Sequence, residues 1–101
     1  MAQSMPNMQM PSPSVNVSPS TQAYQAAMHT MSEGMAAPYT GDADKDFVNG
    51  MIPHHQGAVD MAQVELKYGM DPQMRILARG IIASQNKEIA LMKAWQAKHE
   101  K

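Results

Sequence analysis

The chain has 101 residues and a formal net charge of −1, and 17% of its residues are charged. A chain of this length is expected to form one small domain with a limited core. It lacks the basic surface that nucleic-acid binding needs and any cluster of basic residues for a membrane surface. No stretch approaches the roughly 20 apolar residues of a membrane span.

Methionine is the unusual component, with 12 copies against no cysteine. Flexible thioethers fill gaps in a core, but this number exceeds what packing alone requires. In a chain without thiols, thioether sulfur is the soft metal ligand that remains. Thioethers do not form disulfides, so such a binder suits an oxidising compartment such as the periplasm.

Residues 1–19 are predicted to be a disordered tail, because they are rich in Pro, Ser and Asn and poor in bulky apolar groups. They lack the basic and apolar regions of a signal peptide, so we expect a mature terminus behind an added Met1. The tail holds Met5, Met8 and Met10. Two interpretations stay open: a random tail that contains methionine, or a flexible thioether arm that wraps an ion.

The first helix is predicted over residues 20–35 of a helical, metal-binding domain that runs to the end of the chain. Ser18 or Ser20 can cap its N-terminus, and Pro19 suits the first helical position. Gly34 marks its end, because glycine accepts the backbone conformations that terminate helices.

Methionines share one face of this first helix. Met28, Met31 and Met35 recur at helical spacing, whereas His29 lies about 100° away from Met28. The spacing favours a methionine-lined packing face. A metal site made from these four residues is the alternative.

The second helix is predicted from about residue 42 to residue 68. Asp42, Asp44 and Asp46 gather at its N-terminus, where the helix dipole favours anions. A calcium site is rejected, because the segment lacks the glycine and the distal glutamate of an EF-hand loop. Pro53 predicts a kink in a continuous helix, with an outright break as the alternative.

A histidine lies in the middle of the predicted buried face of this second helix. The face consists of Phe47, Val48, Met51, His55, Val59, Ala62 and Leu66. Adjacent side chains diverge by about 100° on a helix. We therefore expect two neighbouring sites, Met51 with His55 inward and His54 with Met61 at the flank, unless the kink at Pro53 lets both rings reach one ion. The alternatives are a surface role for His54 and a purely structural role for His55.

The third helix is predicted over about residues 72–98. Gly69 suits the position after the second helix, Asp71 the N-cap of the third, and Pro72 its first position. A link this short forces an antiparallel hairpin. The predicted fold is therefore all-α, an antiparallel helical hairpin with a shorter N-terminal helix.

Two polar residues, Gln85 and Glu88, interrupt the apolar stripe of the third helix. Pairing positions by equal distance from residue 70 brings His55 level with Gln85. Buried polar groups need partners, so we expect His55 to bond Glu88 or Gln85 whatever the function. Its other ring nitrogen can then serve as a metal ligand. The predicted cluster contains Met51, His55, Gln85, Glu88 and Met92.

Two motifs carry a resemblance to a known family. The pattern M-x-x-H-H-x-x-A-x-x-M-A is present as Met51, His54, His55, Ala58, Met61 and Ala62, and Q-x-x-E-I-x-x-M as Gln85, Glu88, Ile89 and Met92. Over roughly residues 42–97 the chain resembles the domain of unknown function 305 family. The resemblance implies a ferritin-like helical fold, and CopM-type secreted members of that family bind copper.

The resemblance also bears on assembly. Members of this family often carry the helical unit twice, whereas this chain has it once. Either a homodimer supplies the missing helices, or the first helix covers the hairpin.

Thioether and imidazole ligands, with the family resemblance, favour copper(I) or silver(I) binding for sequestration, transfer or resistance. The expected location is periplasmic or secreted, and a periplasmic copper-handling protein is the expected partner. No enzymatic activity is expected, because the sequence lacks paired Glu-x-x-His motifs, a nucleophile elbow and a phosphate-binding loop. The alternative function is a metal-free helical interaction module whose methionine-rich face receives a partner helix.

Overall fold

The computed structural model describes residues 17–99. It contains three helices, α1 (Pro19–Gly34), α2 (Ala43–Tyr68) and α3 (Pro72–His99), and no strand in this part of the chain. The predicted all-helical fold is confirmed. Of the predicted disordered tail over residues 1–19, only the last three residues are described, and Pro19 already belongs to α1; the rest lies outside the described residues.

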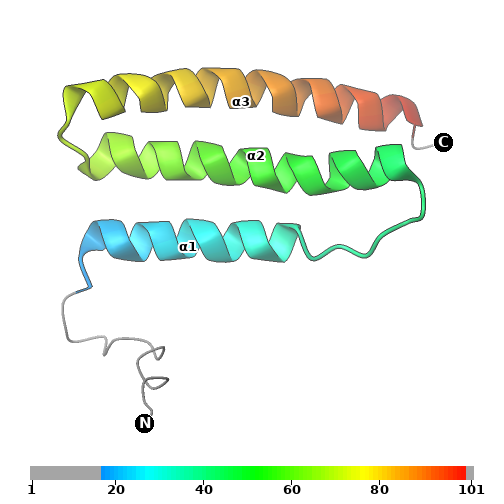
Figure 1. Ribbon diagram of the computed structural model, residues 1–101, viewed down its shortest axis with the longest axis horizontal. Coiled ribbons are helices and arrows are strands. Elements are labelled where there is room, and N and C mark those ends of the chain that lie inside the picture. Colours follow the sequence, from blue (N-terminus) through cyan, green and yellow to red (C-terminus); the bar gives the residue numbers. More distant parts are fainter. Residues whose placement is uncertain (1–16, 100–101) are drawn as a thin grey trace, which may run out of the picture.

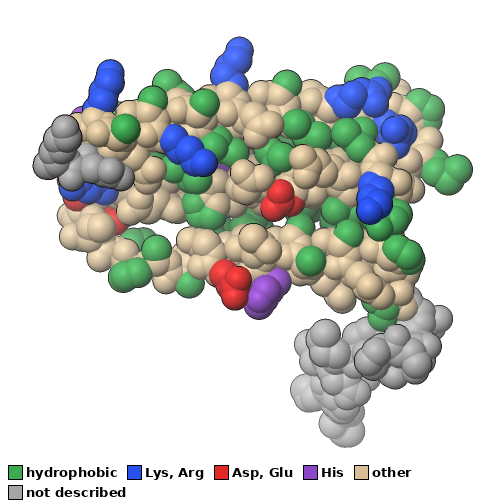
Figure 2. Space-filling model, turned by 180° about the vertical axis from the view of Figure 1, so that it is seen from behind, with side chains coloured by type: hydrophobic (Ala, Val, Ile, Leu, Met, Phe, Trp, Pro, Cys, Tyr) green, Lys and Arg blue, Asp and Glu red, His purple; other side chains and the backbone are tan. Residues whose placement is uncertain are grey.

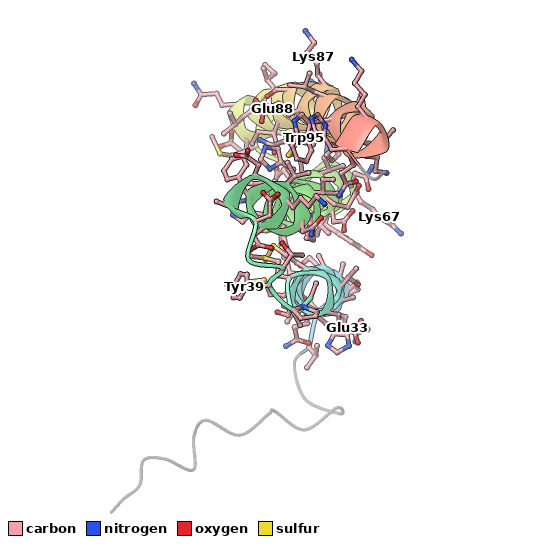
Figure 3. The ribbon with its side chains drawn as sticks, turned by 90° about the vertical axis from the view of Figure 1, so that its right-hand side faces the viewer. Glu33, Tyr39, Lys67, Lys87, Glu88 and Trp95 are labelled. Carbon is pink, nitrogen blue, oxygen red and sulfur yellow. The ribbon has the colours of Figure 1, made fainter. Side chains whose placement is uncertain are left out.

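The three helices form a single layer with α2 in the middle (Figure 1). α2 packs against both α1 and α3, whereas α1 and α3 do not contact each other among the described residues. The view along the helices shows the three in a row (Figure 3). As a result, α2 is covered on two opposite sides, and both faces of the layer are open.

The ends of α1 follow from local chemistry at one end and from packing at the other. The Ser18 hydroxyl accepts a hydrogen bond from the Thr21 N–H at 3.1 Å, so Ser18 is the N-cap. Gly34 is the last helical residue, but its backbone is not left-handed. A Cβ added at Gly34 would lie 2.7 Å from the Cβ of Pro53 on α2. Glycine at this position therefore lets the end of α1 approach α2 closely.

α2 continues through Pro53 without a break, as predicted. Proline removes one backbone donor from the helix interior. Its half-buried ring lies against the end of α1. At the N-terminus, the Asp42 carboxylate accepts hydrogen bonds from the backbone of Asp44 at 3.0 Å and Lys45 at 3.2 Å.

The link between α2 and α3 differs from the prediction at Gly69. Asp71 caps α3 as predicted, accepting from the Gln73 N–H at 2.8 Å, and Pro72 begins the helix. Gly69, in contrast, is extended (φ −76°, ψ 152°) and not left-handed. The Arg75 guanidinium donates to the carbonyl of Gly69 at 3.1 Å, which satisfies an acceptor beyond the end of α2.

The two helices of the hairpin pair close to the predicted register, since Ala62 and Ala78 line one groove. The side-chain hydrogen bonds across the hairpin reach a few residues further along α3. His55 bonds Glu88, three residues beyond Gln85, the residue expected at its level. The amide of Gln96 donates to Asn49 at 3.0 Å, a bond that is offset in the same direction. The first turn of α3 extends beyond the end of α2 (Figure 1).

The core of the layer is thin and made of small side chains. Its buried residues are Ala27, Val48, Val59, Ala62, Val64, Ala78, Ile89 and Met92. Phe47, predicted on the buried face of α2, is 62% exposed, because it lies one residue outside the stripe that meets α3. Within residues 17–99, no helix is both long and apolar enough to cross a membrane.

Glycine substitutions test the close approach of α1 to α2. Gly80 of α3 has nothing within 4 Å of an added Cβ. Gly80→Ala should therefore raise the free energy of unfolding by about 0.5–1 kcal/mol through helix propensity. Gly34→Ala should lower it by about 1–3 kcal/mol, because the new methyl group meets the ring of Pro53. Chemical denaturation of both variants measures the difference, and equal gains at both positions would contradict the packing of α1 described above.

The loop before α2 depends on an ionised Asp46. Its carboxylate accepts hydrogen bonds from the Thr40 N–H at 2.8 Å, the Thr40 hydroxyl at 2.9 Å and the Gly41 N–H at 3.2 Å. The bond from the Thr40 N–H is the main cause that lowers the pKa of Asp46 below its ordinary value of 3.8.

A lowered pKa in the folded chain means that this stabilisation is complete above pH 3.8 and is lost as the pH falls through the lower folded value. Asp46→Asn should therefore reduce the stability difference between near-neutral and acidic pH. Unfolding free energies of the native chain and the variant across this range provide the measurement. An unchanged acid dependence in Asp46→Asn would show that other carboxylates control it.

Candidate metal site

The imidazole of His55 lies between α2 and α3, and its side chain is 14% exposed. Its Nε2 bonds the Glu88 carboxylate at 2.5 Å. Its Nδ1 is buried and has no hydrogen-bond partner among the described residues. The predicted bond from His55 to a polar residue of α3 is therefore present, with Glu88 as the partner.

The two ring nitrogens of His55 have different chemistry. An ionised carboxylate only accepts hydrogen bonds, so in the neutral ring Nε2 carries the proton and Nδ1 carries the lone pair. Buried polar atoms almost always have partners, so a buried lone pair without one calls for an explanation. A histidine that binds a metal commonly uses one nitrogen for the ion and donates the other N–H to a carboxylate. The surroundings of His55 fit that arrangement.

His54 and His55 point in different directions, as predicted. Their ring centroids lie 6.0 Å apart, with an angle of 59° between the ring planes. His54 is exposed to solvent, whereas His55 is largely covered. The two rings therefore belong to different surroundings, one inside the hairpin and one on an open face of the layer.

The open face that carries His54 is rich in methionine and apolar groups. A groove of about 400 Å³ crosses all three helices there, with Tyr24, Met61 and Leu77 in its lining. A second groove, of about 600 Å³, runs between α2 and α3 nearer the C-terminus of the chain, with Phe47 and Leu91 in its lining. We call this surface the methionine face; it comprises Tyr24, Met28, Met35, Phe47, Met51, His54, Met61, Met74, Leu77 and Leu91.

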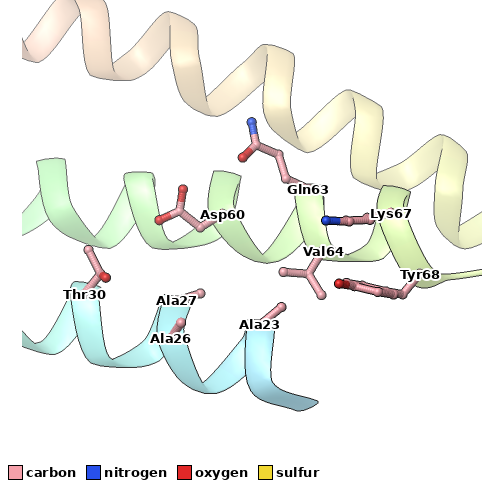
Figure 4. Close-up of a pocket in the computed structure, with 9 residues that line it drawn as sticks. All are labelled: Ala23, Ala26, Ala27, Thr30, Asp60, Gln63, Val64, Lys67 and Tyr68. Atoms are coloured by element: carbon pink, nitrogen blue, oxygen red, sulfur yellow. The ribbon is translucent and has the colours of Figure 1, made fainter. Parts of the chain in front are cut away.

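The opposite side of the layer is polar. A groove of about 350 Å³ between α1 and α2 is lined there by alanines of α1 and by Asp60, Gln63 and Lys67 of α2 (Figure 4). Figure 2 shows lysine and arginine side chains spread over this side, along α3 and near the turn. Lys67 and Tyr39 project to opposite sides of the layer (Figure 3). Charged side chains are therefore prominent on this side, whereas those that line the grooves of the methionine face are few: Asp44, Glu65 and Lys98.

The predicted ligands of α1 separate into two groups. Met31 is half-buried and lies directly over Gly57 of α2, while Met28 and Met35 are 50% and 47% exposed on the methionine face. His29 is elsewhere: it pairs with Glu33 at 3.2 Å. Figure 3 shows Glu33 on the side of α1 away from α2. The structure therefore packs Met31 on α2, leaves Met28 and Met35 exposed, and places His29 apart from them.

The remaining predicted ligands lie at three depths. Met92 is buried between α2 and α3, Met51 is half-buried, and Met61 is 43% exposed on the methionine face. Within residues 17–99, no three His, Asp or Glu side chains gather as a possible metal site.

Sequence reasoning did not identify the α3 part of the methionine face. Met74, Leu77 and Leu91 are 46%, 54% and 70% exposed beside the methionines of α2. The signal was present in the spacing: Leu77, Ile81, Ser84, Glu88, Leu91 and Trp95 follow each other at intervals of four and three residues. This is the period of helices that pack in bundles.

Comparison with known proteins identifies the family. The family described as Domain of unknown function (DUF305) matches residues 1–96, so the chain belongs to it. The match begins before the region of roughly 42–97 from which the resemblance was drawn. The chain is also similar to Uncharacterized protein L153 of Acanthamoeba polyphaga mimivirus, with 46% identity over 46 residues, which is 46% of this chain. The matched segment covers 30% of that relative's length.

The bond between His55 and Glu88 has an exposed counterpart that serves as a control. Glu88→Ala should destabilise the chain by about 1–3 kcal/mol, because it leaves both nitrogens of a covered imidazole without a partner. Glu33→Ala should change stability by no more than about 0.5 kcal/mol, because its His29 partner is exposed on the same helix. Denaturant unfolding of both variants measures this. Equal effects would show that the His55 pair does not stabilise the hairpin.

Proposed function

We propose that this protein binds copper(I) or silver(I) through thioether sulfur and imidazole nitrogen. Its role would be the sequestration or transfer of the ion, or resistance to it, in the periplasm or outside the cell. The ion is the cargo of the protein, which handles it without a catalytic step. The observation that carries this proposal is the buried His55 Nδ1, which has no partner among the described residues, in a ring whose Nε2 bonds Glu88.

The surroundings of His55 support a soft ion. Met51 precedes His55 by one helical turn, and Met92 faces α2 from α3 in the register of the hairpin. Thioether and imidazole together suit copper(I), whereas zinc prefers thiolate, imidazole and carboxylate. The inner site of the proposal therefore consists of Met51, His55 and Met92, with Glu88 orienting the ring.

The flanking residues add a second, more accessible set of ligands. His54 and Met61 lie on the methionine face near Met28 and Met35. Exposed sulfur at this surface would let an ion exchange with a partner that handles copper. The ferritin-like bundle implied by the family resemblance is part of the proposal too, since the layer supplies a hairpin of the kind that such bundles pair.

A second candidate function is a metal-free interaction module. The observation that favours it is the apolar character of the methionine face, where Phe47 and Leu91 are 62% and 70% exposed. Flexible methionine side chains adapt to partner helices. If this alternative holds, Met→Leu substitutions on this face leave the function intact, because the sulfur atoms bind no metal.

Metal titration separates the two functions. Under reducing conditions, copper(I) measured by competition with a chromophoric chelator should bind more tightly than zinc(II). Met51→Leu should weaken binding, while Met70→Leu at the exposed turn should not, because only the first removes a proposed ligand. Glu88→Gln should weaken copper(I) binding by about 10–100-fold through loss of the ring's orientation.

Methionine methyl NMR supplies the positional readout for the same titration. Signals of Met51 and Met92 should shift on addition of copper(I), while the signal of Met70 should stay unchanged. If copper(I) binds no better than zinc(II), or if no methyl signal moves, the proposed function is wrong and the interaction module is favoured.

A further inference from the structure

Each helix of the layer carries a stripe on the methionine face with the period of a helical bundle. In α2, Phe47, Met51, His54, Ala58, Met61 and Glu65 follow at intervals of four and three residues. In α1 the same intervals join Tyr24, Met28, Met31 and Met35, and α3 has the stripe that runs from Leu77 to Trp95. Helices with this period bury it against another helix. Within the described chain, Met31 of these stripes packs on α2 and Glu88 bonds His55, while most of the large apolar side chains of the stripes stay exposed.

The open surface has the size of a stable interface. Eight large apolar side chains of the methionine face are between 37% and 70% exposed: Tyr24, Met28, Met35, Phe47, Met61, Met74, Leu77 and Leu91. An aromatic side chain presents about 150–250 Å² in full, so the face offers on the order of 800 Å², which is what one partner contributes to a standard interface. The thin core of the layer makes a second layer the natural source of further burial.

The three stripes are centred at the same level along the helices. The α2 stripe has its midpoint at position 56, between His54 and Ala58. Met31 lies over Gly57, so this level falls between Met28 and Met35 on α1. The α3 stripe, from Leu77 to Trp95, has its midpoint at position 86. Because His55 bonds Glu88, this position lies within two residues of the same level. One two-fold axis across the layer can therefore map all three stripes onto themselves.

We propose that a second copy of this chain covers the methionine face, related by a two-fold axis that crosses the helices at this level. Each helix then packs antiparallel on its own copy, and the two hairpins form a four-helix bundle flanked by the α1 helices. Met51 lies opposite the partner's Met61. The small Ala58 lies opposite the partner's His54, which lets the two α2 helices approach closely.

The charges and the position of α1 both favour this arrangement. Glu65 and Glu88 are the only charged residues in the α2 and α3 stripes. The axis places Glu65 opposite the partner's Phe47 at the rim and Glu88 opposite the partner's Ser84, so no like charges meet. A two-fold axis parallel to the helices would stack α2 on the partner's α3. It would leave Tyr24, Met28 and Met35 uncovered, whereas the crossing axis covers them.

The dimer also resolves a geometric difficulty of the flanking ligands. This step rests on the proposed copper(I) binding, whereas the dimer itself does not. His54 and Met61 of one chain are seven residues apart, about 10 Å along the helix axis, which is too far for one ion to hold both without distortion. Across the axis, His54 of one copy lies within one helical turn of the partner's Met61. Two shared sites follow, each with ligands from both copies.

Sedimentation equilibrium of the full, metal-free chain tests the dimer over a range of concentrations. The native chain should be dimeric. Leu77→Glu and Leu91→Glu should be monomeric and should keep their helical circular dichroism, because both side chains are exposed within each chain. Ile76→Glu is the matched control, because Ile76 is 64% exposed and lies eleven residues before Lys87, which projects away from α2 (Figure 3). That variant should stay dimeric.

A monomeric native chain at every concentration would overturn the proposal, and so would an Ile76→Glu variant that dissociates as fully as Leu77→Glu.

The register of the dimer is tested separately. The chain has no cysteine, so Ile81→Cys combined with Leu91→Cys should form a disulfide between copies on oxidation, because these positions face each other across the axis. Ile81→Cys alone should not. A disulfide with the single variant and none with the pair would overturn the antiparallel register.

Mixing of variants tests the shared sites. His54→Ala and Met61→Leu should each lose the flanking copper(I) sites. After random exchange of subunits in an equal mixture, half of the dimers contain both variants and one complete site, so about a quarter of the native flanking sites should return. No recovery would show that each flanking site lies within one chain.

The dimer and the proposed function can fail independently. A dimer that binds no copper(I) would reject the proposed function and keep the dimer, whereas a monomer that binds copper(I) would reject the dimer and keep the proposed function.

Discussion

The bond between His55 and Glu88 is the constraint on which the hairpin depends. The interface of α2 and α3 consists mainly of small apolar side chains such as Val59, Ala62 and Ala78, which pack comparably well in several registers. The imidazole has a carboxylate partner in only one of them. A slip of one turn would leave a covered ring unpaired, at a cost of about 1–3 kcal/mol. The pair therefore selects the register and, through it, the positions of Met51 and Met92.

The place of α1 follows from glycine on both sides of its contact with α2. Gly34 lies against Pro53, and Gly57 lies under Met31, so a side chain is absent wherever the two helices come closest. α1 consequently lies beside α2 and not across the hairpin. The expectation that the first helix covers the hairpin is therefore not met. α1 extends the layer and, among the described residues, leaves the methionine face of the hairpin open.

The extent to which the fold follows from the sequence depends on the range of the interactions involved. Asp71 was predicted as a cap, and Ser18 as one of two candidates with Ser20, because a cap bonds its own helix within three residues. The partner of His55 stayed open between Gln85 and Glu88, because the choice depends on a bond between residues 33 positions apart. Phe47 was placed in the core because two stripes of α2 differ by a single residue, and periodicity alone does not say which stripe meets α3.

These two neighbouring stripes give the adjacent histidines different surroundings. Each stripe contains one histidine at its middle: His55 in the stripe that meets α3, and His54 in the stripe that is open. The inner ring is held by a carboxylate and presents a fixed lone pair, which suits tight retention of an ion. The outer ring is exposed beside thioethers, which suits ligand exchange. Under the proposed function, a protein that accepts a soft ion and also releases it needs both properties, and the two histidines would supply them one residue apart on a single helix.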